Sequence, residues 1–148
     1  MTAKIFKKVI HLAYLIFITS EIMEVILLSC PFCKKIKKII ENEKAFAIYD
    51  KYPVSKGHLL IITKRHVKSY FTTTHEEKKA LDDLICKAKK LLDKKYNPDG
   101  FNIGINEGES AGQTVDHLHI HLIPRYKGDI KNPTGGVRGV IPEKRIYP

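Results

Sequence analysis

The sequence predicts a single α+β domain. Three short segments rich in β-branched or aromatic residues are bounded by Gly, Pro, Asn or Asp, which is typical of strands. One longer segment repeats apolar residues at helical spacing behind a capping motif. The chain has 148 residues, enough to bury one core. Short strands and one long helix in a chain of this size favour a sheet accompanied by that helix.

The three strand-like segments are Ala45–Asp50, His58–Thr63 and Phe101–Ile105. The first two are separated by the turn-forming residues Tyr52–Gly57, which include a proline, a serine and a glycine. We therefore expect the first two strands to be antiparallel neighbours.

The helix is expected from about Glu76 to Lys95. Thr74 and Glu77 have the spacing of a capping box, and Asn97–Gly100 ends the helix with an Asn-Pro-Asp-Gly sequence. Cys86 is expected to be a small buried apolar residue of this helix. The other apolar residues share one face: Ala80, Leu81, Leu84, Ile85, Ala88, Leu91 and Leu92.

Composition and charge narrow the class of protein. A hydrophobic fraction of 43% with 28% charged residues excludes collagen-like, disordered and multi-pass membrane chains. The 26 Lys and Arg against 16 Asp and Glu give a formal net charge of +10. That charge favours anionic partners such as nucleotides, polyphosphates, nucleic acid or a membrane surface. A basic surface without a specific partner is equally consistent with it.

The beginning of the chain contains an apolar run, Val9–Ile18, and Leu27–Cys30 loosely resembles a lipoprotein cleavage site. Glu21 and Glu24 interrupt the apolar stretch, which is then too short and too charged for a membrane span. We therefore expect a cytoplasmic protein without a membrane anchor. Met23 is an alternative start of translation.

Two of the three cysteines form the pair Cys30-x-x-Cys33. Three cysteines are too few for a disulfide scaffold. The pair suits a metal clip, a redox dithiol or two inert thiols in a reducing compartment.

The segment Gly112–Pro124 alternates polar and apolar residues, which predicts a strand. A period of two places His117, His119 and His121 on one face, about 6.5–7 Å apart. The other face is apolar, with Leu118, Ile120 and Leu122. A purely metal-binding histidine cluster and a half-exposed strand without function are the alternatives.

The alternation His-φ-His-φ-His-φ-φ (φ apolar), preceded by Gly-Gln-Thr, resembles the histidine triad family of nucleotide hydrolases and transferases. The resemblance covers residues 30–148, from Cys30–Cys33 through Gly57-His58 to Gly135–Arg138, and leaves residues 1–29 as an N-terminal extension. It implies an antiparallel sheet of about five strands with one long helix. It also implies a homodimer, because the family pairs its sheets across a twofold axis.

The resemblance implies hydrolysis of a nucleoside 5′-polyphosphate or a nucleoside phosphoramidate at the α-phosphorus, releasing a nucleoside monophosphate. Dinucleoside tetraphosphate is the first substrate expected. A neutral imidazole is able to attack phosphorus and form a nucleotidyl-histidine that water then hydrolyses. His119 matches the family's nucleophile, His121 and His58 match the supporting imidazoles, and Asn106 matches the side chain directed at the leaving-group oxygen.

The same resemblance implies a substrate pocket. Gln113 and Thr114 belong to the turn that contacts phosphate, and Asp50 matches the carboxylate that holds the ribose hydroxyls. Phe32 and Ile48 match positions around the base and the ribose. Without the resemblance, Asp50 reads as an ordinary turn residue at a strand end, and Phe32 and Ile48 as core.

Some members of the superfamily bind structural zinc, and the resemblance implies Cys30, Cys33, His66 and His117 as the ligands here. Such a zinc braces the strand of the nucleophile, and no catalytic metal is expected. The chain departs from many family members in two places: the short basic stretch over residues 34–44 and the tail from Lys127 to Pro148.

Two other functions remain open at this point. A nucleotidyltransferase or phosphorylase passes the same intermediate to phosphate instead of water. A zinc-stabilised nucleic-acid-binding module is favoured by the net charge and the Cys-x-x-Cys pair. It needs aromatic residues among the basic ones, and the stretch over residues 34–44 has none.

Overall fold

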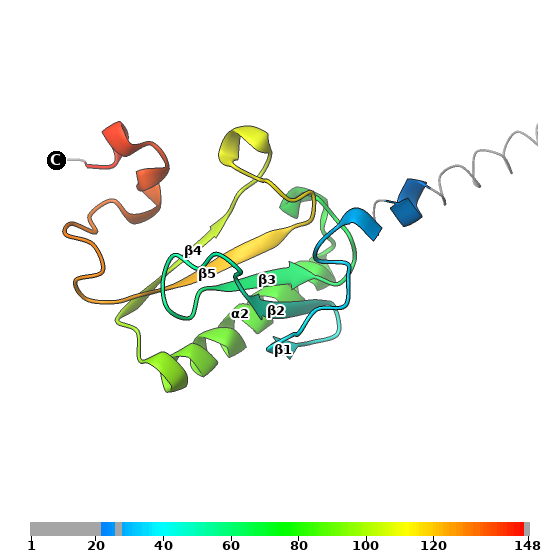
Figure 1. Cartoon of the computed structure of the whole chain (residues 1–148), viewed down its shortest axis with the longest axis horizontal. Helices are drawn as coiled ribbons and strands as arrows, with labels where there is room; N and C mark the ends of the chain where they lie inside the picture. The colour runs from blue at the N-terminus through cyan, green and yellow to red at the C-terminus, as the bar shows by residue number, and fades with distance from the viewer. Residues whose placement is uncertain (1–21, 26–27, 147–148) are drawn as a thin grey trace, which may run out of the picture. The chain divides into compact units, whose positions relative to one another are not determined.

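The computed structural model describes residues 22–25 and 28–146, which belong to two compact units, Met1–Lys35 and Ile36–Pro148 (Figure 1). In the first unit, residues 22–25 and 28–29 are helical. A turn follows, in which the Cys33 amide donates to the Cys30 carbonyl at 3.3 Å. Expectations resting on the apolar run Val9–Ile18 fall outside the described residues. Within the described residues, no helix is long and apolar enough to cross a membrane.

The second unit contains a five-stranded antiparallel sheet in the order β1-β2-β3-β5-β4 and one long helix, α2 (Figure 1). The predicted α+β class and the antiparallel sheet are confirmed. The elements are β1 Ile40–Glu41, β2 Ala45–Tyr49, β3 Leu59–Thr63, η1 Tyr70–Thr72, α2 His75–Tyr96, β4 Gly100–Ile105, η2 Glu109–Ala111, β5 His119–Arg125, η3 Gly136–Val140 and η4 Pro142–Lys144.

Strands β2 and β3 pair antiparallel, as the turn between them predicted. Each is one residue shorter than expected, and the two residues left out, Asp50 and His58, face each other just beyond the strands. The Asp50 amide donates to the His58 carbonyl at 3.0 Å. The turn before His58 needs glycine at position 57. Gly57 has a φ of +88°, and a Cβ there would lie 2.8 Å from the Tyr96 ring. The end of α2 thus fixes the loop that carries His58.

The start of α2 confirms the predicted capping box. The Glu77 amide donates to the Thr74 hydroxyl oxygen at 3.2 Å, and the Thr74 amide donates to the Glu77 carboxylate at 2.9 Å. Arg65 donates twice to the same carboxylate, at 2.8 Å each. These hydrogen bonds satisfy the Glu77 carboxylate, which is buried. The segment after β3 is thereby fastened to the first turn of the helix.

The core lies between α2 and the facing side of the sheet. Helix and sheet contribute Ala45, Ala47, Leu59, Ile61, Leu81, Leu84, Ala88, Leu92, Ile120 and Leu122, together with Val67 and Leu118 from the connecting segments. The expectation that Cys86 is buried is wrong, because its side chain is exposed. Cys86 follows the buried Leu84 by two positions, and a step of two residues on a helix leads to nearly the opposite face.

Strand β5 begins at His119, so the prediction of a strand over all of Gly112–Pro124 is wrong at its beginning. Gly112 has φ +84°, and the Gln113 side chain holds the segment as a loop. It accepts from the Gly108 amide at 2.8 Å and donates to the carbonyls of Lys68 and Val115. These hydrogen bonds outweigh the alternating pattern, and His117 consequently lies outside the strand.

Candidate functional site

His119 is the first residue of β5 and is nearly buried, with 7% of its surface exposed. Its Nδ1 lies 2.8 Å from the carbonyl oxygen of His117. A carbonyl only accepts, so Nδ1 must carry the proton. In the neutral form of the ring the lone pair is therefore on Nε2, and a nucleophilic imidazole attacks with this nitrogen.

His58 and His121 are linked in a hydrogen-bonded chain. The Val54 amide donates to His58 Nδ1 at 3.4 Å, and His58 Nε2 lies 3.0 Å from His121 Nδ1. Because the amide is only a donor, this bond favours the His58 tautomer with the proton on Nε2, and in that tautomer His58 donates to His121 Nδ1. The remaining proton of His121 is then on Nε2. Among the described residues, this nitrogen is the one buried side-chain polar atom without a hydrogen-bond partner.

The surroundings keep both rings neutral. Burial lowers the pKa of His58, and burial followed by the neighbouring His119 and His58 lowers the pKa of His121 to about 4. The Asp50 carboxylate lies 3.5 Å from His58 Nδ1 and 4.0 Å from His121 Nδ1, and it opposes these shifts. Both imidazoles therefore act at neutral pH as hydrogen-bond donors without a net charge.

Asp50, His58 and His121 also lie close enough for one cation, with one ligand atom of each within 4.8 Å of the others. The hydrogen bonds described above already use both nitrogens of His58 and Nδ1 of His121. The arrangement is accordingly a proton-fixing chain that ends in the His121 Nε2–H.

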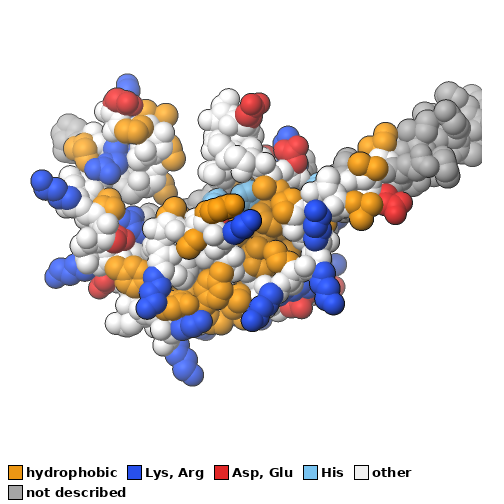
Figure 2. All heavy atoms as spheres, viewed as in Figure 1, with side chains coloured by type: hydrophobic (Ala, Val, Ile, Leu, Met, Phe, Trp, Pro, Cys, Tyr) orange, Lys and Arg blue, Asp and Glu red, His pale blue; other side chains and the backbone are white. Residues whose placement is uncertain are grey.

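A cavity of about 350 Å³, here called the His121 cavity, opens beside this chain. Figure 2 shows histidine atoms at the floor of a hollow in this face of the molecule. The volume is in the range of small-molecule sites. Its lining is formed by Asp50, Tyr52, Val54, His58, Asn102, Ile103, Gly104, Asn106, His121, Ile123 and Val137.

Four residues expected at the site, Asp50, His58, Asn106 and His121, therefore line one cavity. Of the two residues of the expected phosphate turn, Thr114 is exposed, and Gln113 is buried with its side chain engaged in the loop. The hydrogen bonds of the Gln113 side chain to Gly108 and Lys68 hold the loop in place.

The expected base-pocket residues lie in different units. Ile48 is buried in β2, with 6% of its surface exposed. Phe32 belongs to the first unit, where it is half-buried in the turn after Cys30. Among the described residues of the second unit, Ile48 is not part of the lining of the His121 cavity.

The second histidine pair, His66 and His117, has ring centroids 4.8 Å apart. His117 is fully buried, and its Nε2 lies 2.9 Å from the Thr63 carbonyl oxygen. Nε2 thus donates to the main chain, and Nδ1 is the nitrogen with the lone pair. A histidine that ligates a metal typically has its other nitrogen bonded in this way. Burial lowers the pKa of His117 to about 4, so the ring is neutral.

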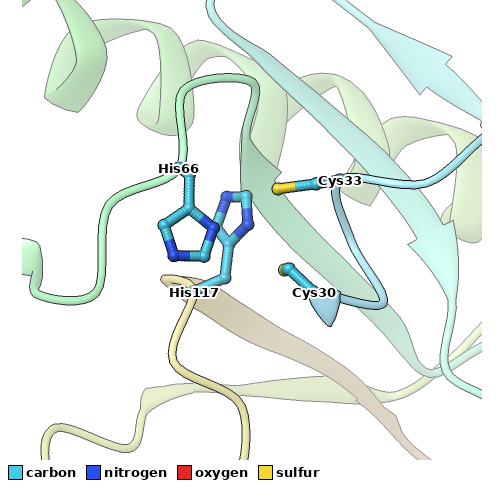
Figure 3. A group of neighbouring side chains, drawn as sticks. All are labelled: Cys30, Cys33, His66 and His117. Atoms are coloured by element: carbon cyan, nitrogen blue, oxygen red, sulfur yellow. The ribbon is translucent and has the colours of Figure 1, made fainter. Parts of the chain in front are cut away.

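The cysteine pair belongs to the first unit. Burial and the neighbouring Cys30 raise the pKa of the Cys33 thiol to about 11. Reactive and redox-active cysteines have lowered values instead. Figure 3 draws Cys30 and Cys33 with His66 and His117, each of which offers one thiolate sulfur or imidazole nitrogen. Two thiolates and two imidazoles are a donor set that zinc takes.

Several contacts at the site were not predicted from the sequence. The Val54 amide that fixes His58 is a main-chain group, and a sequence pattern does not reveal such a donor. Thr63, which fixes His117, ends a predicted strand, and its position beside the histidines depends on the pairing of β3 with β5. Asn102 and Val137 line the cavity from β4 and from the tail.

Comparison with known proteins gives a consistent result. The HIT domain profile matches residues 34–128. The chain is 40% identical over 94 residues to a bis(5′-adenosyl)-triphosphatase of Dictyostelium discoideum, covering 62% of this chain and 61% of the relative. It is 34% identical over 108 residues to an AP-4-A phosphorylase of Mycobacterium tuberculosis, covering 71% and 55%. It is 37% identical over 110 residues to an adenosine 5′-monophosphoramidase of Candida albicans, covering 66% and 70%.

Solved structures are similar as well. A HIT family protein from Bacillus anthracis has a TM-score of 0.64 and 38% identity, covering 68% of this chain and 76% of the other. A zinc-bound histidine triad family protein from Mycobacterium smegmatis has a TM-score of 0.65 and 32% identity, covering 72% and 81%.

Proposed function

Because the chain belongs to the histidine triad (HIT) family, we propose that it hydrolyses nucleoside 5′-polyphosphates or nucleoside phosphoramidates at the α-phosphorus. The first substrate we propose is a dinucleoside tetraphosphate, and one product is a nucleoside monophosphate. The observation that carries the proposal is the bond from His119 Nδ1–H to the His117 carbonyl. In the neutral imidazole this bond leaves the lone pair on Nε2, which is the attacking atom of the proposal.

In the first step, His119 Nε2 forms a bond to the α-phosphorus while the bond from phosphorus to the leaving-group oxygen or nitrogen breaks. The leaving group takes up a proton. In the second step, water attacks phosphorus, the P–N bond to His119 breaks, and the monophosphate leaves. Water supplies the oxygen that phosphorus gains, and the proton it releases replaces the one that the leaving group took up from solvent in the first step. The P–N electron pair returns to His119 Nε2, so the enzyme is restored.

The hydrogen-bonded chain assists both steps. The unpartnered His121 Nε2–H donates to a non-bridging phosphoryl oxygen as negative charge builds up there. His58 holds His121 in the tautomer that makes this donation possible. Asn106, which lines the same cavity, donates to the leaving-group atom, and Asp50 at its rim holds the ribose. Thr114 is proposed to contact the phosphate, with Gln113 bracing the loop that carries it. Ile48 and Phe32 remain predictions for the base pocket.

We further propose that Cys30, Cys33, His66 and His117 bind one structural zinc ion. The donor set supports this, as does the His117 tautomer with its lone pair on Nδ1. A relative of known structure is zinc-bound. Bound there, zinc ties the segments that carry its ligands together. Thiolate ligands require a reducing compartment, so the same proposal places the protein in the cytoplasm.

A homodimer through β4 belongs to the proposal. β4 is an edge strand of the sheet, and the Ile103 side chain is 49% exposed on it. An edge strand with an exposed apolar residue is suited to pairing with a second copy. Sedimentation of the purified chain tests this: a monomer at micromolar concentration overturns it.

The intermediate is tested directly by rapid acid-free quenching of the protein mixed with substrate labelled at the α-phosphorus. Label is expected on wild-type protein, stable in alkali and labile in acid as a phosphoramidate is, and absent from His119→Ala. Equal labelling of His119→Ala would overturn the assignment of the nucleophile.

A phosphorylase is the second candidate, favoured by the relative named AP-4-A phosphorylase. The same nucleotidyl-histidine then passes to phosphate and yields a nucleoside diphosphate. Turnover in phosphate buffer with analysis of the products decides between the two: monophosphate alone supports hydrolysis, and diphosphate supports phosphorolysis. A nucleic-acid-binding role is not favoured, because lysine and arginine side chains are scattered over the face in Figure 2, with apolar side chains between them.

A further inference from the structure

A second cavity lies at the end of the sheet where β4 begins and β5 ends. Its volume is about 610 Å³, compared with about 350 Å³ for the His121 cavity. The segment that follows β5, orange in Figure 1, forms part of its wall. We call it the distal cavity, and the residues that matter for its chemistry are Asn102, Arg125, Tyr126, Lys127, Ile130 and Lys131.

The two cavities are on one face of the sheet. Side chains alternate along β5, so His121, Ile123 and Arg125 point to the side opposite the core residues Ile120 and Leu122. Six residues of extended strand separate His119, where the α-phosphorus would lie, from Arg125, a distance of about 20 Å. A chain of several phosphates together with the second nucleoside spans much of such a distance.

Asn102 lines both cavities and lies at their border. Arg125 Nη1 donates to its side-chain oxygen at 2.6 Å. A guanidinium only donates, so this bond fixes which end of the Asn102 amide is oxygen. The amide NH2 group points away from Arg125, and within the described chain it has no hydrogen-bond partner. It offers two donors at the point where a phosphate chain would pass.

The distal cavity has charge suited to an anion. Arg125 is engaged with Asp129 by two bonds, of 2.6 and 2.8 Å. Lys127 and Lys131 have no ion-pair partner among the described residues, and both line the cavity. The carboxylate of Asp99, also in the lining, accepts from the Lys127 main-chain amide at 2.7 Å. Ile130 adds an exposed apolar surface for a base.

We propose that the distal cavity is the subsite for the leaving nucleotide of a dinucleoside polyphosphate. The α-phosphorus lies at His119, the phosphate chain passes Asn102, and the distal nucleotide lies beside Lys127 and Lys131. This inference rests on the proposed function and deepens it, since it assigns the larger of the two cavities to the leaving group. The amine released from a phosphoramidate is too small to reach it.

The test compares two substrates, dinucleoside tetraphosphate and adenosine 5′-phosphoramidate, on three proteins. These are wild type, Lys127→Ala/Lys131→Ala, and a control pair on the exposed face of α2, Lys87→Ala/Lys90→Ala. For the distal pair, KM for the tetraphosphate is expected to rise about three- to tenfold, because two solvent-accessible charge contacts are lost. KM and kcat for the phosphoramidate stay unchanged, which also shows that the protein is folded.

A second variant, Ile130→Trp, narrows the distal cavity without changing its charge, and it is expected to raise KM for the tetraphosphate only. Unchanged KM for the tetraphosphate in both variants, or an equal change for both substrates, overturns the subsite while leaving the hydrolase standing. Wild-type protein that turns over neither substrate overturns the proposed function and the subsite with it.

Discussion

The second unit contains two groups of histidines that differ in what surrounds them. His58 and His121 bond to each other beside a carboxylate and an open cavity, and the chain ends in an N–H without a partner. His66 and His117 lie together and do not line that cavity. Nε2 of His117 is bonded to the main-chain carbonyl of Thr63. The same side chain is thus prepared for donating to substrate in one group and for ligating a metal in the other.

The largest effect is expected from His119→Ala. Removing the nucleophile should lower turnover by several orders of magnitude, as loss of a covalent catalyst does. Substrate binding and the melting temperature should change little, because His119 is neither among the residues that line the His121 cavity nor part of the core cluster. Single-turnover kinetics and calorimetric binding measure both. If His119→Ala keeps a substantial part of the wild-type rate, His119 is not the nucleophile.

Zinc content separates the second group from the first. Wild-type protein purified without chelator should contain about one zinc per chain, and Cys33→Ser should lose it and melt at a lower temperature. Cys86→Ser is the matched control, because Cys86 is exposed on α2 and outside the ligand set. Metal analysis by mass spectrometry gives the stoichiometry. Absence of zinc from the wild type would contradict the metal site, and His66 and His117 would then have only a structural role.

The pH dependence of stability reports on the first group. The pKa of His121 is about 4 in the folded chain, below the ordinary value of 6.5. Between these two pH values the unfolded chain therefore binds the proton more tightly than the folded chain does. Stability from His121 is therefore complete above about pH 6.5 and is lost as the pH falls toward 4. In zinc-loaded protein, His121→Gln should reduce that loss by about 1–3 kcal/mol. Urea unfolding at several pH values measures it, and identical pH profiles would contradict the buried, neutral ring.

The smallest effect is expected from Thr74→Ala. Loss of the hydroxyl that accepts from the Glu77 amide should lower the free energy of unfolding by about 1 kcal/mol. Turnover and zinc content should stay unchanged, because neither histidine group contacts this cap. The variant therefore shows what a purely structural loss looks like. A change in either readout would mean that the helix start and the histidines are coupled.

Local signals in the sequence were sufficient for much of the fold. The capping box at Thr74, the turn before Gly57 and the apolar stripe of α2 all depend on residues within one or two turns of each other, and they were predicted correctly. The start of β5 was not, because the bonds that hold Gln113 in a loop reach Lys68, 45 residues away.

The histidines proposed as catalytic were singled out by their sequence pattern and the family resemblance, but their environment was not predictable. The tautomers of His58 and His117 are set by main-chain groups of Val54 and Thr63, which have no signature in the sequence. The second cavity depends on the course of the tail after Arg125, where turns and short 3-10 segments replace any periodic pattern.

The acceptor that orients His119 is a main-chain carbonyl, and this has a consequence for how the site tolerates genetic change. A substitution at position 117 removes an imidazole but keeps the carbonyl oxygen, since every amino acid has one. The direction of the His119 ring is thus insulated from side-chain mutation at its nearest hydrogen-bonding neighbour. Changes that move the backbone at the junction of the loop and β5 would turn the ring, so sequence drift at this junction would damage the chemistry even where every side chain near His119 is kept.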